Sequence, residues 1–170
     1  MKKYSNIALT VVLCFGLIET SFGQALKAEK IAELNVMIDP PTMAGSKIIY
    51  PIIGGTIRGE INGKVLPIGA DFGTLLSPTN FKLDVREVIQ TDDGATIYVT
   101  YTGFIHADAE TFGLLVSGRA GEVNPEQYYF RVNPVFETTS EKYDWLNHTL
   151  AVGVGKVTET GVSYVLYAIR

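Results

Sequence analysis

The amino-acid sequence predicts a single all-β domain built from short antiparallel strands. Apolar and polar residues alternate with a period of two almost everywhere after Lys30, and this period is typical of half-buried strands. No segment keeps the spacing of a helix over more than about two turns. The length of 170 residues supports one hydrophobic core rather than two domains, and 46% hydrophobic with 19% charged residues is a globular composition.

The first 23 residues have the pattern of a cleavable secretory signal peptide. Lys2 and Lys3 precede an apolar run over residues 7–18, and the small residues Ser21 and Gly23 follow. A run of about a dozen apolar residues is too short to cross a hydrocarbon core of roughly 30 Å, which disfavours a transmembrane anchor. We expect cleavage after Gly23, a secreted or periplasmic protein, and no membrane span once the leader is removed.

The expected mature chain, residues 24–170, is one domain without cysteine. Cys14 is the only cysteine in the sequence and lies in the apolar run of the leader. Disulfides, thiol nucleophiles and thiolate metal ligands are therefore not expected in the mature domain. Removal of the leader takes away two lysines and one glutamate and leaves a net charge of −5, which argues against nucleic acid as a partner.

Strand periodicity occurs in segments that are separated by turn residues. We expect strands at residues 31–38, 47–53, 56–61, 82–90, 96–102, 114–117, 127–132, 150–157 and 162–169. Asn62-Gly63 and Asp93-Gly94 are dipeptides that supply the positive φ of tight loops, so each predicts an antiparallel hairpin. Asp39-Pro40-Pro41, Ser77-Pro78 and Asn133-Pro134 lack backbone donors and are expected in loops or at strand ends.

Helix is expected to be minimal in this chain. Residues 141–147 are the best helical stretch and are predicted to form a short turn, while residues 25–30 are expected to be a loose segment before the first strand. Short antiparallel strands without long helices form either a sandwich or a barrel. Residues 162–169 are apolar or aromatic almost throughout, so both faces need cover, which favours closure into a barrel over an edge strand.

Sequence motifs for metal or cofactor chemistry are missing. The two histidines, His106 and His148, do not have the spacing of metal ligands. Ser117-Gly118 lacks the flanking glycines of a nucleophile elbow. Gly153-Val154-Gly155 has too few glycines for a dinucleotide-binding loop, and no helix pattern follows it. The sequence therefore predicts neither a metal site nor a cofactor.

Charged side chains and aromatic rings share several of the predicted strands. In Tyr129-Phe130-Arg131, alternation directs Tyr129 and Arg131 to one side of the wall and Phe130 to the other. If the first side is the lumen, Arg131 gives an apolar pocket a fixed charge. If it is the solvent side, Arg131 and Arg86 form ordinary cross-strand pairs. Alternation alone leaves both interpretations open.

Seven short strings carry a family resemblance from about Leu34 to Ile169, nearly all of the mature chain. They are Pro51-Ile-Ile-Gly-Gly-Thr56, Val65-Leu-Pro-Ile-Gly-Ala-Asp71-Phe72, Leu83-Asp-Val-Arg86, Thr91-Asp-Asp-Gly-Ala95, Tyr129-Phe-Arg131, Pro134-Val-Phe-Glu137 and Tyr143-Asp-Trp-Leu-Asn147. Together they resemble the bacterial and fungal family called domain of unknown function 3237 (DUF3237). The resemblance implies a single antiparallel β-barrel of about eight to ten strands, lipocalin-like in general shape, without a settled activity. Phe72 and Glu60 depart from the family pattern, which commonly has Trp and Pro at these positions.

The resemblance also implies a set of candidate site residues. The polar positions within the strings are Asp71, Arg86, Arg131, Glu137, Tyr143, Trp145 and Asn147. Strand arginines near loop carboxylates either hold a barrel mouth together or present a guanidinium to a ligand. We expect Arg131, Glu137 and Trp145 to line one pocket, with Asp71 and Asn147 at its rim.

Two functions are consistent with such a pocket. The first is binding of a small, partly apolar molecule, with candidate ligand-binding residues Arg131, Trp145, Tyr101, Tyr129, Tyr143 and Asn147. The second is a cofactor-independent lyase, isomerase or hydrolase, with Asp71 or Glu137 as general base and Arg86 or Arg131 stabilising an oxyanion. A pocket carboxylate without an arginine partner favours the enzyme, because burial raises its pKa. An interaction protein that uses a barrel edge is disfavoured, because no long exposed apolar strand is visible.

Overall fold

The computed structural model describes residues 25–170, and the predicted leader lies outside the described residues. The strands are β1 (Ala28–Ile38), β2 (Thr42–Ala44), β3 (Lys47–Gly59), β4 (Gly63–Ser77), β5 (Asn80–Thr91), β6 (Thr96–His106), β7 (Tyr129–Glu137), β8 (Ala151–Thr158) and β9 (Gly161–Ile169). The helical segments are α1 (Ala109–Val116) and the 3-10 turns η1 (Ala120–Glu122), η2 (Pro125–Gln127) and η3 (Glu141–His148). The prediction of an all-β chain with little helix is confirmed.

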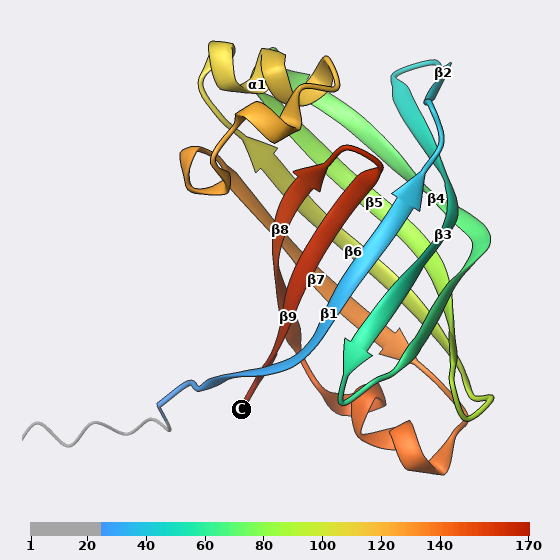
Figure 1. Ribbon diagram of the computed structural model, residues 1–170. Helices are drawn as coiled ribbons and strands as arrows, with labels where there is room; N and C mark the ends of the chain where they lie inside the picture. The colour runs from blue at the N-terminus through green and yellow to red at the C-terminus, as the bar shows by residue number, and fades with distance from the viewer. Residues whose placement is uncertain (1–24) are drawn as a thin grey trace, which may run out of the picture.

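Eight of these strands form a closed antiparallel barrel (Figure 1). Strands that are neighbours in sequence pair from β3 through β9, and β1 closes the wall by pairing with both β9 and β3. β2 lies beside this ring and pairs only with the start of β3. Closure leaves the barrel wall without a free edge. The prediction of a barrel rather than a sandwich is therefore confirmed.

Two glycines allow β1 and β3 to approach each other where the barrel closes. Gly55 and Gly59 have φ values of 151° and 146°, a region that residues with side chains rarely adopt. A Cβ at Gly55 would lie 2.1 Å from the carbonyl oxygen of Asn35, and a Cβ at Gly59 would lie 2.4 Å from that of Ile31. Closure of the barrel therefore requires glycine at these two positions.

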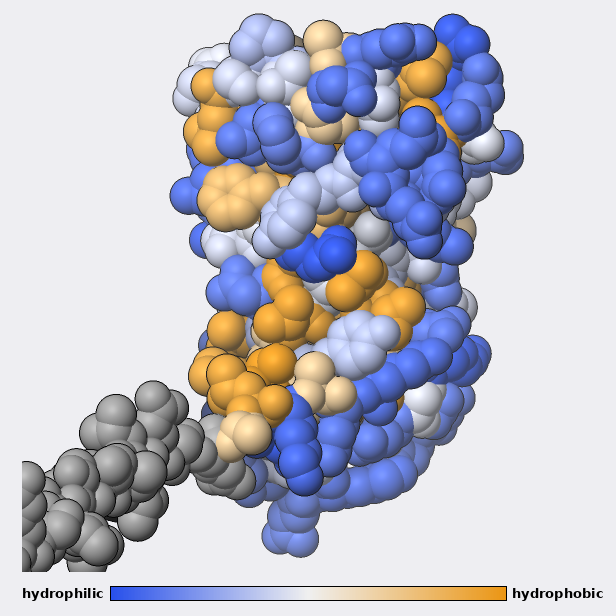
Figure 2. Space-filling view, turned by 90° about the vertical axis from the view of Figure 1, so that its left-hand side faces the viewer, coloured by the Kyte–Doolittle hydropathy of each residue, from blue (hydrophilic) through white to orange (hydrophobic). Residues whose placement is uncertain are grey.

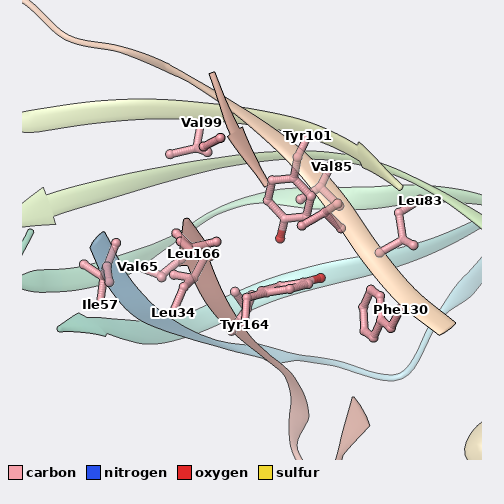
Figure 3. Close-up of a cluster of buried hydrophobic side chains, with 14 of the residues drawn as sticks. Leu34, Ile57, Val65, Leu83, Val85, Val99, Tyr101, Phe130, Tyr164 and Leu166 are labelled. Carbon is pink, nitrogen blue, oxygen red and sulfur yellow. The ribbon is translucent and has the colours of Figure 1, made fainter. Parts of the chain in front are cut away.

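Alternate residues of each strand fill the barrel interior. In β5, Val85, Glu87 and Ile89 are buried inside, while Arg86 between them lies outside. Figure 3 shows part of this core, where side chains from opposite walls meet.

On the outer face in Figure 2, an apolar area lies among polar side chains. None of the helices within residues 25–170 has the length and apolar character needed to cross a membrane.

The two ends of the barrel are covered by different segments (Figure 1). α1 and η1 lie over one end, and η3 lies over the other. α1 begins at a cap in which Asp108 Oδ1 accepts a 2.8 Å hydrogen bond from the backbone N–H of Thr111. Phe112 and Leu115 are buried one helical turn apart. The strand predicted at residues 114–117 is therefore wrong, because this cap and this spacing produce a helix that covers the barrel.

β4 is the longest strand and is not among the predicted strands. Pro67, Gly69 and Gly73 interrupt its alternation of apolar and polar residues. Its pairing with β5 also shifts between Val65 and Gly69, so a single period of two does not run through it. The structure similarly joins the predicted strands at residues 47–53 and 56–61 into the single strand β3.

Pro134 lies inside β7, opposite Tyr101 of β6, and not at the strand end that its missing N–H predicted. β7 pairs with β8 only at Arg131 and Val132. Pro134 therefore lies beyond the β7–β8 ladder, where a residue without a backbone donor interrupts no pairing with β8.

Candidate functional site

A cavity of about 470 Å³ opens into the barrel at the end that α1 covers. Its wall is formed by residues of β1, β3, β4, β5, β6 and β9, by α1, and by the end of β8 with the turn that follows it. Most of the lining side chains are apolar, among them Ile52, Leu83, Val85 and Phe112. A cavity of this size and character is typical of a small-molecule site.

Asp71 is the carboxylate on the inner wall of this cavity. It lies on β4 in register with Val85 of β5, so its side chain points inward as that of Val85 does. The ladder between β4 and β5 has no paired residues at Phe72 and Gly73, and Asp71 Oδ1 accepts a 2.9 Å hydrogen bond from the backbone N–H of Asp84. This hydrogen bond orients the carboxylate without neutralising it.

Burial raises the pKa of Asp71 from its ordinary value to about 7. The hydrogen bond from Asp84 N–H and the charge of Lys47 lower the pKa, but they oppose burial only in part. The Lys47 ammonium donates to the carbonyl of Phe72 and the hydroxyl of Thr74, each at 3.1 Å, and not to Asp71. Near neutral pH, Asp71 is therefore present in both its protonated and its ionised form.

Three tyrosines surround the same cavity. Tyr50, Asp71, Val85 and Tyr101 are paired in register across β3, β4, β5 and β6, which places their side chains in one layer of the interior. Tyr164 enters from β9 on the other side, with its ring 5.6 Å from that of Tyr101 in an edge-on contact (Figure 3). Burial is the main cause that raises the pKa of Tyr101 and of Tyr164 well above the usual value, so both remain neutral phenols.

Glu87 lies inside the barrel next to the cavity. Its side chain is fully buried, and the hydroxyl of Tyr101 is 3.5 Å from its Oε2. Its Oε1 has no hydrogen-bond partner among the described residues, and neither has the hydroxyl of Tyr164. Burial raises the pKa of Glu87 to about 8, so the group is mostly a neutral carboxylic acid at pH 7.

The charged groups of the cavity are all acidic. Of the described residues that line it, Asp39, Asp71 and Glu159 are acidic and none is Lys, Arg or His. Asp39 and Glu159 lie in the loops at the α1 end, while Asp71 lies on the wall. The electrostatic environment therefore disfavours an anionic ligand.

The two arginines of the predicted site lie outside the barrel. Arg86 forms a 2.7 Å ion pair with Asp84 on the outer wall. Arg131 donates a 2.8 Å hydrogen bond to the carbonyl of Phe130, and its guanidinium lies over the exposed ring of Tyr129. The solvent-side interpretation of Arg131 is correct, because its neighbours Phe130 and Val132 occupy the inner face of β7.

Tyr129 is exposed at the start of β7, while the remaining predicted residues, except Asp71 and Tyr101, lie towards the η3 end. Glu137 is exposed at the end of β7, and Trp145 lies in η3 with the guanidinium of Arg170 5.9 Å from its ring centre. The hydroxyl of Tyr143 donates to Asp93 at 3.2 Å, and Asn147 Nδ2 donates to the carbonyl of Thr138 at 2.9 Å.

The predicted pocket of Arg131, Glu137 and Trp145 is thus wrong as a description of this cavity, since none of them lines it. Arg131 is on the outer wall, Glu137 ends β7, and Trp145 lies in η3 at the far end of the barrel. Asp71 and Tyr101 do line the cavity, as inner-wall residues. Tyr50, Glu87 and Tyr164 were not among the predicted site residues. A signal for Glu87 was present, because an acid alternates there with Val85 and Ile89 on an otherwise apolar face.

Fold and site together define a closed eight-stranded antiparallel barrel with an internal, mainly apolar cavity and a single wall carboxylate. The chain belongs to the DUF3237 family of proteins of unknown function, whose family model matches residues 26–169. A UPF0311 protein of Rhodopseudomonas palustris (strain TIE-1) is 41% identical over 111 residues, which are 64% of this chain and 71% of that protein.

Solved structures of similar proteins share the fold. A conserved protein of unknown function from Rhodopseudomonas palustris superposes with a TM-score of 0.82 at 33% identity, covering 87% of this chain and 99% of that one. A β-barrel-like protein from Acinetobacter baumannii superposes with a TM-score of 0.75 at 35% identity, covering 87% and 98%. The family resemblance found in the sequence is confirmed.

Proposed function

We propose that this protein binds a small, mainly apolar molecule in the cavity at the α1 end of the barrel. The observation that carries the proposal is the cavity itself, about 470 Å³ of internal space with apolar walls and a few polar groups. An exposed apolar surface of this kind costs free energy in water, and a ligand that covers it recovers that free energy. Asp71 and the tyrosine hydroxyls are the groups that orient such a ligand.

A second candidate function is a cofactor-independent enzyme that uses the same cavity. It is favoured by Asp71, which enters the cavity without an arginine or lysine partner and has a pKa of about 7. A general acid or base is most effective when its pKa lies near the working pH. Asp71 therefore replaces Glu137 as the proton-transfer group, and Arg86 and Arg131 have no part in this proposal.

We also propose that the protein works outside the cytoplasm. The support for this is the leader pattern of residues 1–23, with its two lysines, its short apolar run and its small residues near the expected cleavage point.

Two adjacent residues of β6 give a matched test of the binding proposal. Ile105 lines the cavity, whereas Phe104 next to it is exposed on the outer wall. We expect the purified protein to bind an uncharged fluorescent probe for apolar sites, such as N-phenyl-1-naphthylamine. Ile105→Trp should weaken binding at least about tenfold by filling the cavity, and Phe104→Trp should leave it unchanged. Equal binding by all three proteins would contradict the proposal.

A further inference from the structure

We propose that the cavity accepts an uncharged molecule with a carbonyl group, and that Asp71 transfers a proton at the carbon beside the carbonyl while the Tyr164 hydroxyl binds its oxygen. The inference rests on the second candidate function and names its substrate class and its reaction. The reaction is an isomerisation between a ketone and its enol, or of a double bond conjugated to that ketone.

The charge of the substrate follows from the lining of the cavity. Its charged residues are Asp39, Asp71 and Glu159, and none of the described lining residues is basic. A carboxylate or phosphate on the ligand would meet like charge without a compensating cation in a partly desolvated site. An uncharged molecule avoids this repulsion and also suits the apolar wall.

The acceptor group of the substrate follows from Tyr164. Tyr164 is a lining residue of the cavity, and its buried hydroxyl has no hydrogen-bond partner among the described residues. A buried hydroxyl without a partner costs free energy, so a ligand oxygen that accepts a hydrogen bond from it is stabilised there. The hydroxyl of the neighbouring Tyr101 lies 3.5 Å from Glu87 Oε2.

The position of the base relative to this donor follows from the strand register. Asp71 lies on β4 between Tyr50 and Val85 in the same layer, and Tyr101 is the next residue of that layer on β6. Tyr164 on β9 packs against the ring of Tyr101. Asp71 and Tyr164 are both lining residues of the cavity. The carboxylate and the phenol therefore face one space.

The proposed step needs no co-reactant. The Asp71 carboxylate takes a proton from the carbon beside the carbonyl, and the electron pair of that C–H bond forms a C=C bond. The π electrons of the carbonyl move onto its oxygen, where a hydrogen bond from the Tyr164 hydroxyl stabilises the negative charge. The protonated Asp71 then returns the proton to the oxygen or to the far carbon of a conjugated system. Every atom of the substrate is retained, and Asp71 ends as it began.

Proton exchange into a simple ketone tests the proposal. 1-Tetralone is uncharged, small enough for the cavity, and exchanges the hydrogens beside its carbonyl slowly in neutral buffer. In heavy water at pH 7.5, we expect the purified protein to accelerate deuterium incorporation about 100-fold over buffer, measured by proton NMR. 1-Naphthoate, an anion of similar size, should bind at least about tenfold more weakly than 1-tetralone.

Three variants separate the roles of the residues. Asp71→Asn should return the exchange rate to that of buffer. Tyr164→Phe should lower the rate about 10- to 100-fold with less than about a twofold change in 1-tetralone binding, because the ring is kept and only the oxyanion donor is lost. Arg131→Gln on the outer wall should have no effect. Because Tyr164→Phe removes a buried hydroxyl without a partner, its melting temperature should not fall.

Each outcome bears on the inference. If 1-tetralone binds and Ile105→Trp blocks it, but exchange runs at the buffer rate, the inference is overturned while the binding function stands. If 1-tetralone does not bind, or 1-naphthoate binds equally well, the assigned substrate class is wrong, and the fluorescent-probe experiment decides the binding function separately. Equal rates in the wild type and Tyr164→Phe would remove the role of Tyr164.

Discussion

The hydroxyl of Tyr101 lies 3.5 Å from Oε2 of Glu87 inside the barrel, where the Glu87 side chain is fully buried. This contact is long for a hydrogen bond to a charged carboxylate, and the second oxygen of Glu87 has no partner among the described residues. A carboxyl group in such surroundings is more stable in its neutral form, as its pKa of about 8 indicates.

Glu87→Gln tests the neutral state of this group. The pKa of Glu87 is raised on folding from 4.5 to about 8, so the wild type loses stability as pH rises through this window. The full difference corresponds to about 5 kcal/mol as an upper bound. Urea unfolding at several pH values should show that Glu87→Gln has a flatter profile and is the more stable protein above pH 8. Glu137→Gln, on the exposed end of β7, should follow the wild-type profile. A parallel profile for Glu87→Gln would show that Glu87 is ionised in the fold.

The pKa of Asp71 should respond to Lys47. Burial raises the pKa of Asp71 to about 7, and the charge of Lys47 opposes this rise. Lys47→Met should therefore raise the pKa of Asp71 further, and Lys82→Met, on an exposed part of β5, should not change it. Carboxyl carbon chemical shifts followed by NMR between pH 4 and pH 9 measure both. A pKa of Asp71 near 4 in the wild type would contradict its assignment as the proton-transfer group.

Gly73 should not tolerate a side chain. A Cβ at this position would lie 1.9 Å from the ring of Phe81, which packs over the β4 backbone beside the cavity. We expect Gly73→Ala to lower the free energy of unfolding by about 1–3 kcal/mol. Gly113→Ala is the matched control, because nothing lies within 4 Å of a Cβ there and alanine in α1 should add about 0.5–1 kcal/mol. Denaturant unfolding at pH 7 compares the two, and equal stability of both variants would be inconsistent with close packing of Phe81.

Export should remove residues 1–23. We expect the protein recovered outside the cytoplasm to begin at Gln24, because the small residues Ser21 and Gly23 suit signal peptidase. Intact-mass measurement of the exported protein gives the cleavage point directly. A full-length mass in that fraction, or protein found only in the cytoplasm, would contradict the secretion proposal.

Much of the fold follows from local features of the sequence. Alternation of apolar residues predicts β1, β5, β8 and β9, and the Asn62-Gly63 and Asp93-Gly94 turns predict the two hairpins that the structure contains. β4 and α1 are the exceptions. β4 carries a proline, several glycines and shifts of register that hide its period, and α1 is a short helix whose apolar residues also fit a strand.

The candidate site depended on tertiary structure. The sequence determined the all-β class of the fold and the family, because these depend on periodicity and on strings of adjacent residues. It placed Arg131 and Tyr129 on one face of a strand but left open whether that face is the lumen. Alternation defines two faces, and only closure of the barrel, with Phe130 and Val132 packed inside, decided which of them is solvent. Closure also brought together Asp71 and Tyr164, which are far apart in the chain, because their register across the strands is a property of the closed sheet.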